Sequence, residues 1–304
     1  MILLAQAASG DAEAQAVSAW EAWPWTLAMV VSALAIVTLL WQRGVVSESR
    51  LRRGRGRPRS LGWVDGVALV GTLLGGMVLA GVLQGVRAGM DPAWADQGSN
   101  TPTEAWLDTM VLGLMWVPSI AWLLFRYCES RRDRRSLGLH PRGLGRALAT
   151  AGLGFVLLVP VAWAVGSVSA MAAEWVRGAP PPEIAHDMLW ALLAARDRPA
   201  MLAAMLTAAV VVAPVCEELV FRGLLQSSLV GVMRGCRWPA ILATSVVFVL
   251  IHVEVAEPES WGVLLVLSIA MGLVYERTGS IWAPVAMHAA FNAMNAAWAL
   301  STPS

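Results

Sequence analysis

The chain has 304 residues, of which 57% are hydrophobic and 14% are charged, and its formal net charge is +1. This composition is far more apolar than a soluble domain of that length needs, so it excludes an ordinary soluble protein and indicates an integral membrane protein. The three cysteines, Cys128, Cys216 and Cys236, have neither CxxC nor metal-site spacing, so the sequence does not imply a disulfide framework.

Apolar windows long enough to cross a bilayer recur along the whole chain. A helix needs about 20 apolar residues to span the hydrocarbon core. We therefore predict an all-α fold, a polytopic transmembrane helix bundle with about eight spanning helices. The predicted spans cover roughly residues 24–42, 62–86, 105–125, 147–173, 206–231, 238–257, 261–276 and 281–300.

The charges in the loops predict how the chain is oriented. Residues 43–59 contain seven arginines and one acid, and residues 126–146 contain seven more arginines. By the positive-inside rule both loops are cytoplasmic, which places the acidic loop between them and both chain termini outside. The apolar start of residues 1–8 is too short for a cleavable signal, so we expect a retained tail. Because the chain is rich in alanine and has no lysine, we expect a multi-pass protein of a bacterial cytoplasmic membrane.

Two segments predict packing or surface structure. Glycines recur mostly four residues apart in the second window, a pattern that lets a neighbouring helix approach closely. They are Gly62, Gly66, Gly71, Gly75, Gly81 and Gly85. Farther along, residues 187–198 predict a short helix that is either interfacial or re-entrant.

Two adjacent carboxylates and an arginine interrupt the fifth window. Charged groups inside a membrane are costly and are usually functional. On a helix, Glu218 and Arg222 form a favourable pair four residues apart, whereas Glu217 is turned about 100° away. Pro214 lacks an N–H, which frees a backbone carbonyl and kinks the helix. We therefore expect Arg222 to neutralise Glu218, and Glu217 to face a cavity as a general base or acid.

Two later windows each carry a histidine with a partner at helical spacing. The pairs are Phe248 with His252 and His288 with Asn292, each on one face of its helix. At about 1.5 Å per residue, Glu217, both histidines and Asn292 lie roughly 12–20 Å from the cytoplasmic ends of their windows. We predict that these side chains converge in one polar layer near the membrane midplane.

Three motifs in chain order resemble those of the CPBP family, the CAAX prenyl proteases and bacteriocin-processing enzymes that are also called Abi proteins. The motifs are Glu217-Glu218-x-x-x-Arg222, Phe248-x-x-x-His252 and His288-x-x-x-Asn292. They cover roughly residues 210–295, and the earlier residues match only in having helices and a basic loop. The resemblance implies a multi-pass intramembrane protease.

The resemblance also implies catalytic roles. Glu217 and His252 would activate a water molecule that attacks a peptide carbonyl. His288 and Asn292 would stabilise the oxyanion that then develops. Both roles are physically sensible, because a carboxylate and an imidazole can polarise water and fixed donors stabilise developing negative charge.

The remaining motif residues, Glu218 and Arg222, would hold the first glutamate in place, as the resemblance implies. A metal-dependent alternative uses Glu217, His252 and His288 as a His₂Glu ligand set for one divalent metal, zinc being the best match. The chain has no HExxH helix, and a metal-free site without any cofactor is the preferred interpretation.

The motifs divide the chain into two regions. Residues 1–146 are predicted to hold three membrane helices and two basic cytoplasmic loops, and residues 147–304 to form the catalytic helix core. We expect the lipid bilayer and a peptide or protein substrate as partners, and no nucleic acid. Two alternatives are a non-catalytic membrane scaffold or chaperone-like partner protein and, less favoured because no internal repeat is found, a proton-coupled transporter.

Overall fold

The computed structural model describes residues 22–53, 61–90, 102–129, 138–139, 143–180 and 186–301. Within these residues every regular element is a helix, which confirms the all-α class, and the one β-type contact is an isolated bridge between His186 and Ala256. In chain order the helices are α1 (Trp23–Gln42), α2 (Glu48–Arg53), α3 (Trp63–Met90), α5 (Pro102–Leu114), α6 (Val117–Glu129), α7 (Leu144–Arg177), α8 (Asp187–Ala194), α9 (Pro199–Thr207), η4 (Ala208–Val212), α10 (Ala213–Glu218), η5 (Leu219–Gln226), α11 (Ser227–Val232), α12 (Arg237–Leu250), α13 (Pro258–Thr278) and α14 (Trp282–Ser301).

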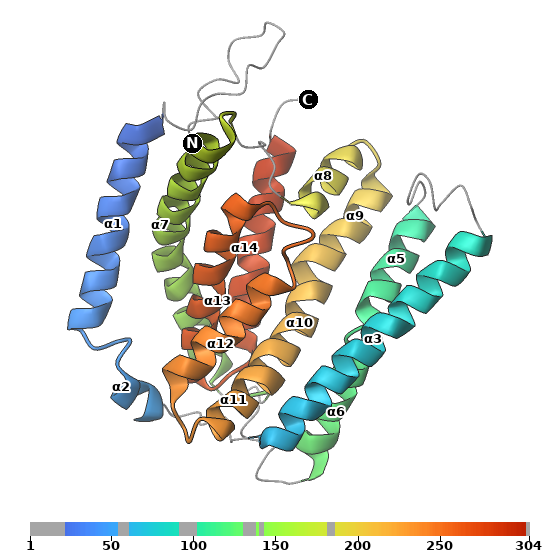
Figure 1. The fold of residues 1–304 in the computed structure, drawn as a ribbon, viewed down its shortest axis with the longest axis horizontal. Coiled ribbons are helices and arrows are strands. Elements are labelled where there is room, and N and C mark those ends of the chain that lie inside the picture. The colour runs from blue at the N-terminus through green and yellow to red at the C-terminus, as the bar shows by residue number, and fades with distance from the viewer. Residues whose placement is uncertain are drawn as a thin grey trace, which may run out of the picture.

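Several predictions concern residues outside the described ranges. They are the retained tail in 1–21, most arginines of the two basic loops in 54–60, 130–137 and 140–142, and most of the acidic loop in 91–101. Among the described residues, α1 starts and α14 ends at the same end of the bundle, opposite α2 (Figure 1). The sides of the membrane on which these ends lie stay a prediction.

Five helical runs are long and apolar enough to cross a membrane, as expected for a multi-pass membrane protein. Each run overlaps a predicted window. They are Trp23–Gln42, Trp63–Met90, Leu144–Arg177, Pro199–Val232 and Pro258–Thr278. The other three windows correspond to α5 with α6, to α12 and to α14, which do not reach the same length and apolarity. The total of eight spans therefore stays a prediction.

The third predicted window is two helices. A turn at Met115 and Trp116 separates α5 from α6, and each of these helices has 13 residues. A helix of that length is about 20 Å long, against about 30 Å for the hydrocarbon core. Pro118 is the second residue of α6, and its missing N–H removes one hydrogen bond that a continuous helix would need.

The close approach along α3 is made at Gly76 and not at the predicted glycines. A Cβ atom on Gly76 would lie 2.0 Å from the carbonyl oxygen of Met115, so α3 can contact the turn between α5 and α6 only with glycine there. The packing prediction was wrong for five other glycines, because a Cβ atom on them would meet no described atom within 4 Å. These are Gly66, Gly71, Gly75, Gly81 and Gly85.

Residues 199–232 form one continuous helical run whose winding changes twice. The run contains two π-helical segments, η4 and η5, and such segments are frequent at functional sites. In the wide register of η4, the N–H of Ala213 bonds to the carbonyl of Ala208, five residues earlier. In the same register, the residue that would donate to the carbonyl of Ala209 is Pro214. Because proline has no N–H, that carbonyl lacks this backbone hydrogen bond.

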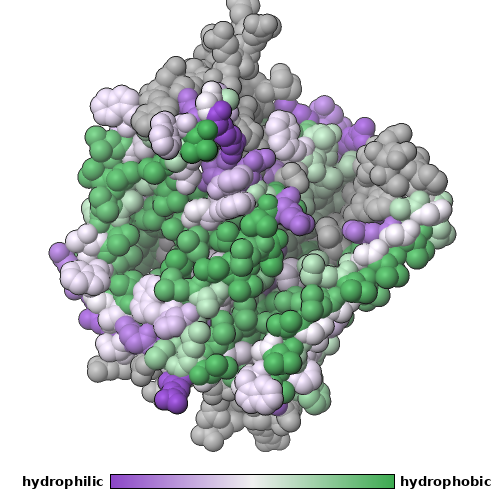
Figure 2. All heavy atoms as spheres, viewed as in Figure 1, coloured by the Kyte–Doolittle hydropathy of each residue, from purple (hydrophilic) through white to green (hydrophobic). Residues whose placement is uncertain are grey.

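The helix α13 lies inside the bundle and is the centre of its C-terminal half. It packs against α7, α12 and α14, while α1 packs on α7 and α3 packs on α6 (Figure 1). The main apolar core includes Phe221, Phe248, Leu267, Met271 and Met287. Large apolar side chains cover the outward faces of the outer helices (Figure 2). Such extensive exposed apolar surface is typical of a protein that meets lipid.

The acidic residue of the first basic loop, Glu48, caps the N-terminal end of α12. Glu48 lies in α2, and its carboxylate accepts hydrogen bonds from the backbone N–H groups of Arg237 at 2.8 Å and Trp238 at 3.1 Å. The first N–H groups of a helix have no partner within the helix, so this carboxylate caps α12 and also suits the helix dipole. The contact fixes α12, whose other end carries the second motif.

Candidate active site

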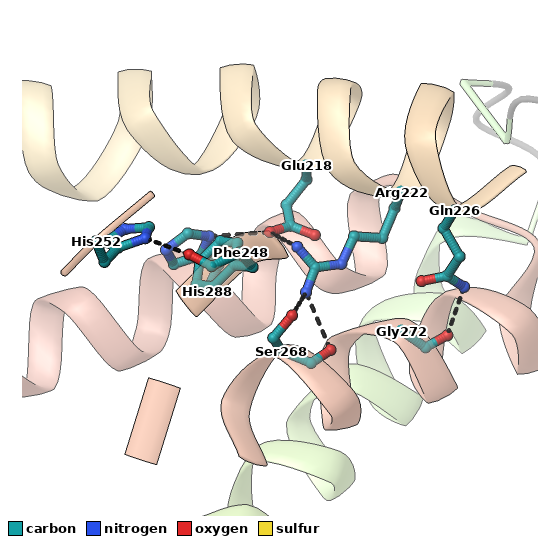
Figure 3. Close-up of polar contacts among 8 residues, drawn as sticks. All are labelled: Glu218, Arg222, Gln226, Phe248, His252, Ser268, Gly272 and His288. Atoms are coloured by element: carbon teal, nitrogen blue, oxygen red, sulfur yellow. Dashed lines mark hydrogen bonds and ion pairs between the residues drawn. The ribbon is translucent and has the colours of Figure 1, made fainter. Parts of the chain in front are cut away.

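Glu218 is the centre of a buried polar cluster (Figure 3). Its Oε1 accepts a hydrogen bond from Nη1 of Arg222 at 3.0 Å, and neither side chain is exposed, so the predicted pair forms. The same Oε1 lies 3.0 Å from Nδ1 of His288 in α14. Because a carboxylate paired with arginine can only accept, the imidazole Nδ1 carries the proton that it donates. Glu218 therefore joins the run 199–232 to α14.

Arg222 is held from a third helix. Its Nη2 donates to the hydroxyl oxygen of Ser268 at 2.8 Å and to the carbonyl oxygen of the same residue at 3.0 Å. Its guanidinium carbon also lies 5.2 Å from the centre of the Phe248 ring, within cation–π distance. A buried charge is stable only when it is paired and hydrogen-bonded, and these contacts meet that need.

The ring of Phe248 contacts both motif histidines. Its centre lies 4.6 Å from the centre of the His252 ring and 5.9 Å from that of His288, to which it stands edge-on. On its other side it packs edge-on against Phe221 at 5.2 Å. Because Phe248 is fully buried, its position restricts the orientation of both imidazole rings.

His252 lies just beyond α12, although the predicted window placed it inside a helix. The helix ends at Leu250, and Nδ1 of His252 is 2.7 Å from the carbonyl oxygen of Phe248. The last carbonyls of a helix lack partners, so the imidazole caps this helix end. A carbonyl can only accept, which assigns the proton to Nδ1 and leaves the lone pair of the neutral ring at Nε2.

Glu217 is the carboxylate of the motif that stays without a fixed partner. The residue is partly buried, and its Oε2 is buried without a hydrogen-bond partner among the described residues. It lies within electrostatic reach of His288 and Arg222. The sequence predicted that His288 converges with Glu217 in one polar layer, but the carboxylate to which His288 is hydrogen-bonded is that of Glu218.

Asn292 follows His288 by one helical turn and reaches the run 199–232. Its Nδ2 donates to the carbonyl oxygen of Ala209 at 2.8 Å. This is the carbonyl to which Pro214 cannot donate, so the Asn292 side chain supplies the hydrogen bond that the backbone lacks there. An amide carries two N–H groups and this bond occupies one of them.

The proposed metal-ligand set is not assembled. In the part of the chain that the structure describes, no three His, Cys, Asp or Glu side chains form a group that could hold a metal ion. Glu217, His252 and His288 are therefore not arranged as the three ligands that a catalytic zinc needs. Hydrogen bonds occupy Nδ1 of both histidines, so Nε2 is the atom through which either ring could act as a ligand. The choice between a metal-dependent and a metal-free site stays a prediction.

Two polar residues of this region were not identified from the sequence. Ser268 lies in a window without any motif, and nothing marks it among its apolar neighbours. Gln226 does carry a signal, because it continues the four-residue series that Glu218 and Arg222 begin inside an apolar window. Its Nε2 donates to Oε1 of Glu276 at 2.9 Å.

The apolar helices and the buried carboxylate–histidine cluster define a multi-pass membrane protein with an enzyme-like polar site. Residues 199–294 match the family model described as type II CAAX prenyl endopeptidase Rce1-like. The chain therefore carries an Rce1-like domain, consistent with a CPBP-family membrane protease, and the matched range contains every predicted site residue. No curated protein and no solved structure matches the chain.

Proposed function

We propose that the chain is an intramembrane endopeptidase that hydrolyses a peptide bond in a membrane-associated peptide or protein. The observation that carries the proposal is the Oε2 of Glu217, which is buried without a hydrogen-bond partner among the described residues, in a motif whose two histidines are each hydrogen-bonded through Nδ1. Oε2 of Glu218 is likewise without a hydrogen-bond partner among the described residues, but its Oε1 is bonded to Arg222 and His288, so Glu217 is the carboxylate that we assign to the reactants together with the two Nε2 atoms. The match to the Rce1-like family supports the same reaction class.

In the first step, Glu217 acts as the general base. Its carboxylate takes a proton from a water molecule while the water oxygen forms a bond to the peptide carbonyl carbon. The Nε2 lone pair of His252 accepts a hydrogen bond from the second O–H of that water and so fixes the direction in which the water attacks. The hydrogen bond from His252 to the carbonyl of Phe248 keeps the ring in this tautomer.

In the second step, His288 and Asn292 stabilise the oxyanion. As the water oxygen bonds to the carbonyl carbon, the π electron pair of the carbonyl moves onto its oxygen, and the second amide N–H of Asn292 and, in the protonated ring, Nε2–H of His288 donate to that oxyanion. Glu218 holds the opposite nitrogen of that ring and balances its charge. The oxyanion pair then re-forms the C=O bond as the C–N bond breaks, and the leaving nitrogen takes the proton from Glu217.

The test uses the full-length protein in detergent and three peptides: a farnesylated CAAX peptide, its unprenylated form and a hydrophobic propeptide. The prenylated peptide is included because the matched family is named for CAAX prenyl substrates. Mass spectrometry should detect cleavage by the wild type and none by Glu217→Ala or His252→Ala. Equal cleavage by both variants and the wild type would overturn the mechanism, and a wild type that cleaves no peptide would count against the function.

The metal-free form of the proposal has its own test. After exhaustive chelation and elemental analysis, a metal-free enzyme should retain its cleavage rate. Loss of activity on chelation, with recovery on adding zinc, would show that a metal takes part.

A further inference from the structure

The run 199–232 and α13 are joined by a regular polar ladder, which we define as the contacts of Arg222 and Gln226 with Ser268, Gly272 and Glu276. The members on each helix are four residues apart, about 6 Å along the axis, so both rows stay on one face. Nη2 of Arg222 reaches Ser268, and Nε2 of Gln226 reaches the carbonyl of Gly272 at 3.4 Å (Figure 3). The same Nε2 donates to Oε1 of Glu276 at 2.9 Å.

The close packing of the two helices fixes the register of this ladder. A Cβ atom on Gly272 would lie 2.9 Å from Oε1 of Gln226 and 3.0 Å from Cγ2 of Ile241. Any larger residue would require the Gln226 amide and the Ile241 side chain to shift, so glycine allows the three helices to pack closely here. At the far end of the ladder, Nη1 of Arg237 donates to Oε2 of Glu276 at 2.7 Å, so α12 is tied to the same row.

Ser268 is the member of the polar ladder that contacts the candidate active site, through Arg222. Of the three hydrogen bonds that the structure gives the Arg222 guanidinium, Ser268 accepts two and Glu218 accepts one. Ser268 and Arg222 are both fully buried, so a hydrogen bond lost between them would leave a buried polar group without a partner, which is costly. The position of the guanidinium beside Glu218 thus depends on α13.

We infer that Ser268 is a positioning residue for the reaction: its hydroxyl holds Arg222 against Glu218, and Glu218 in turn holds His288. Among the described residues the side-chain hydrogen bonds of Ser268 go to Arg222 alone, so we assign it an effect through the arginine. The catalytic consequence rests on the proposed endopeptidase function. The contact itself can be tested separately.

The activity test compares Ser268→Ala with a matched buried serine. Losing one hydrogen bond to a charged group should lower kcat about 10-fold, with KM within about twofold of the wild type because substrate contacts are unchanged. Ser268→Cys keeps a weak acceptor of similar shape and should fall between serine and alanine. The control is Ser245→Ala in α12, since Oγ of Ser245 is also buried but has no hydrogen-bond partner among the described residues. Equal kcat values for Ser268→Ala and Ser245→Ala would overturn the inference.

The stability test does not require any cleavage. Ser268→Ala should lower the thermal unfolding midpoint in detergent by about 3 °C. It should change nothing in a Glu218→Gln/Arg222→Met background, where both charges are removed together so that neither is left buried alone. The same decrease in both backgrounds would show that Ser268 acts independently of Arg222. If the wild type cleaves no peptide, the proposed function fails, while this double-mutant cycle still decides whether Ser268 holds the arginine.

Discussion

The helix α3 and the run 199–232 are equally apolar over their most apolar windows, and each buries 17% of that window. They differ in where their polar residues lie. In α3 the charged residues are near the ends, and Asp65 bonds to Arg126 and Trp122 to attach the helix to α6. In the run 199–232 the charges lie near the middle, where Arg222 is bonded to α13 and Glu218 to α14. Apolarity thus indicates a membrane helix, whereas polar residues within its length indicate a site.

The largest effect should come from the glutamate that has no fixed partner. Glu217→Gln removes the proposed proton acceptor and should lower kcat by about 10²- to 10⁴-fold. Its unfolding midpoint should stay at the wild-type value, because the buried Oε2 makes no hydrogen bond to the described residues. Initial rates and thermal unfolding of the same preparation check both parts. An active Glu217→Gln protein would place the base elsewhere.

The neighbouring glutamate should behave differently. Glu218→Gln leaves the Arg222 guanidinium buried without its carboxylate, which should cost about 3–5 kcal/mol of unfolding free energy. Thermal unfolding in detergent measures the loss, and Glu217→Gln is the matched control one residue away. Identical midpoints for the two variants would contradict the assignment of Glu218 as the buried ion-pair partner.

The two asparagines of α14 provide the next comparison. Asn292→Ala removes the amide that bonds to the carbonyl of Ala209 and should lower kcat by about 10²- to 10³-fold if that amide stabilises the oxyanion. Asn295→Ala is the control, since its amide bonds at 3.0 Å to Phe291 within its own helix. A similar rate for both variants would remove Asn292 from the mechanism.

The smallest effect concerns α3, away from the candidate site. Gly76→Ala would place a Cβ atom against the Met115 carbonyl and should destabilise the protein by about 1–3 kcal/mol. Gly75→Ala meets no described atom within 4 Å and should leave stability unchanged or raise it by about 0.5–1 kcal/mol. Thermal unfolding of the two variants separates these results. A loss of stability in Gly75→Ala instead would mean that another surface packs on this face.

The sequence predicted the parts of the site that follow from spacing along one helix. The contact between Glu218 and Arg222 forms because four residues make about one helical turn. Pro214 frees a carbonyl because it has no N–H, wherever the helix lies. The three motifs were likewise sufficient to indicate the family that matches residues 199–294.

The contacts between different helices could not be predicted from the sequence and were decided by the tertiary structure. Spacing cannot specify which glutamate His288 contacts, because that depends on how α14 is rotated against the run 199–232. Nor can it reveal that Ser268 holds Arg222, since a serine in an apolar window has no pattern of its own. The sequence by itself determined the membrane class and the polar residues available for chemistry, because these follow from composition and local geometry. Only packing decided which of those residues are bonded to one another and left Oε2 of Glu217 without a partner in the described structure.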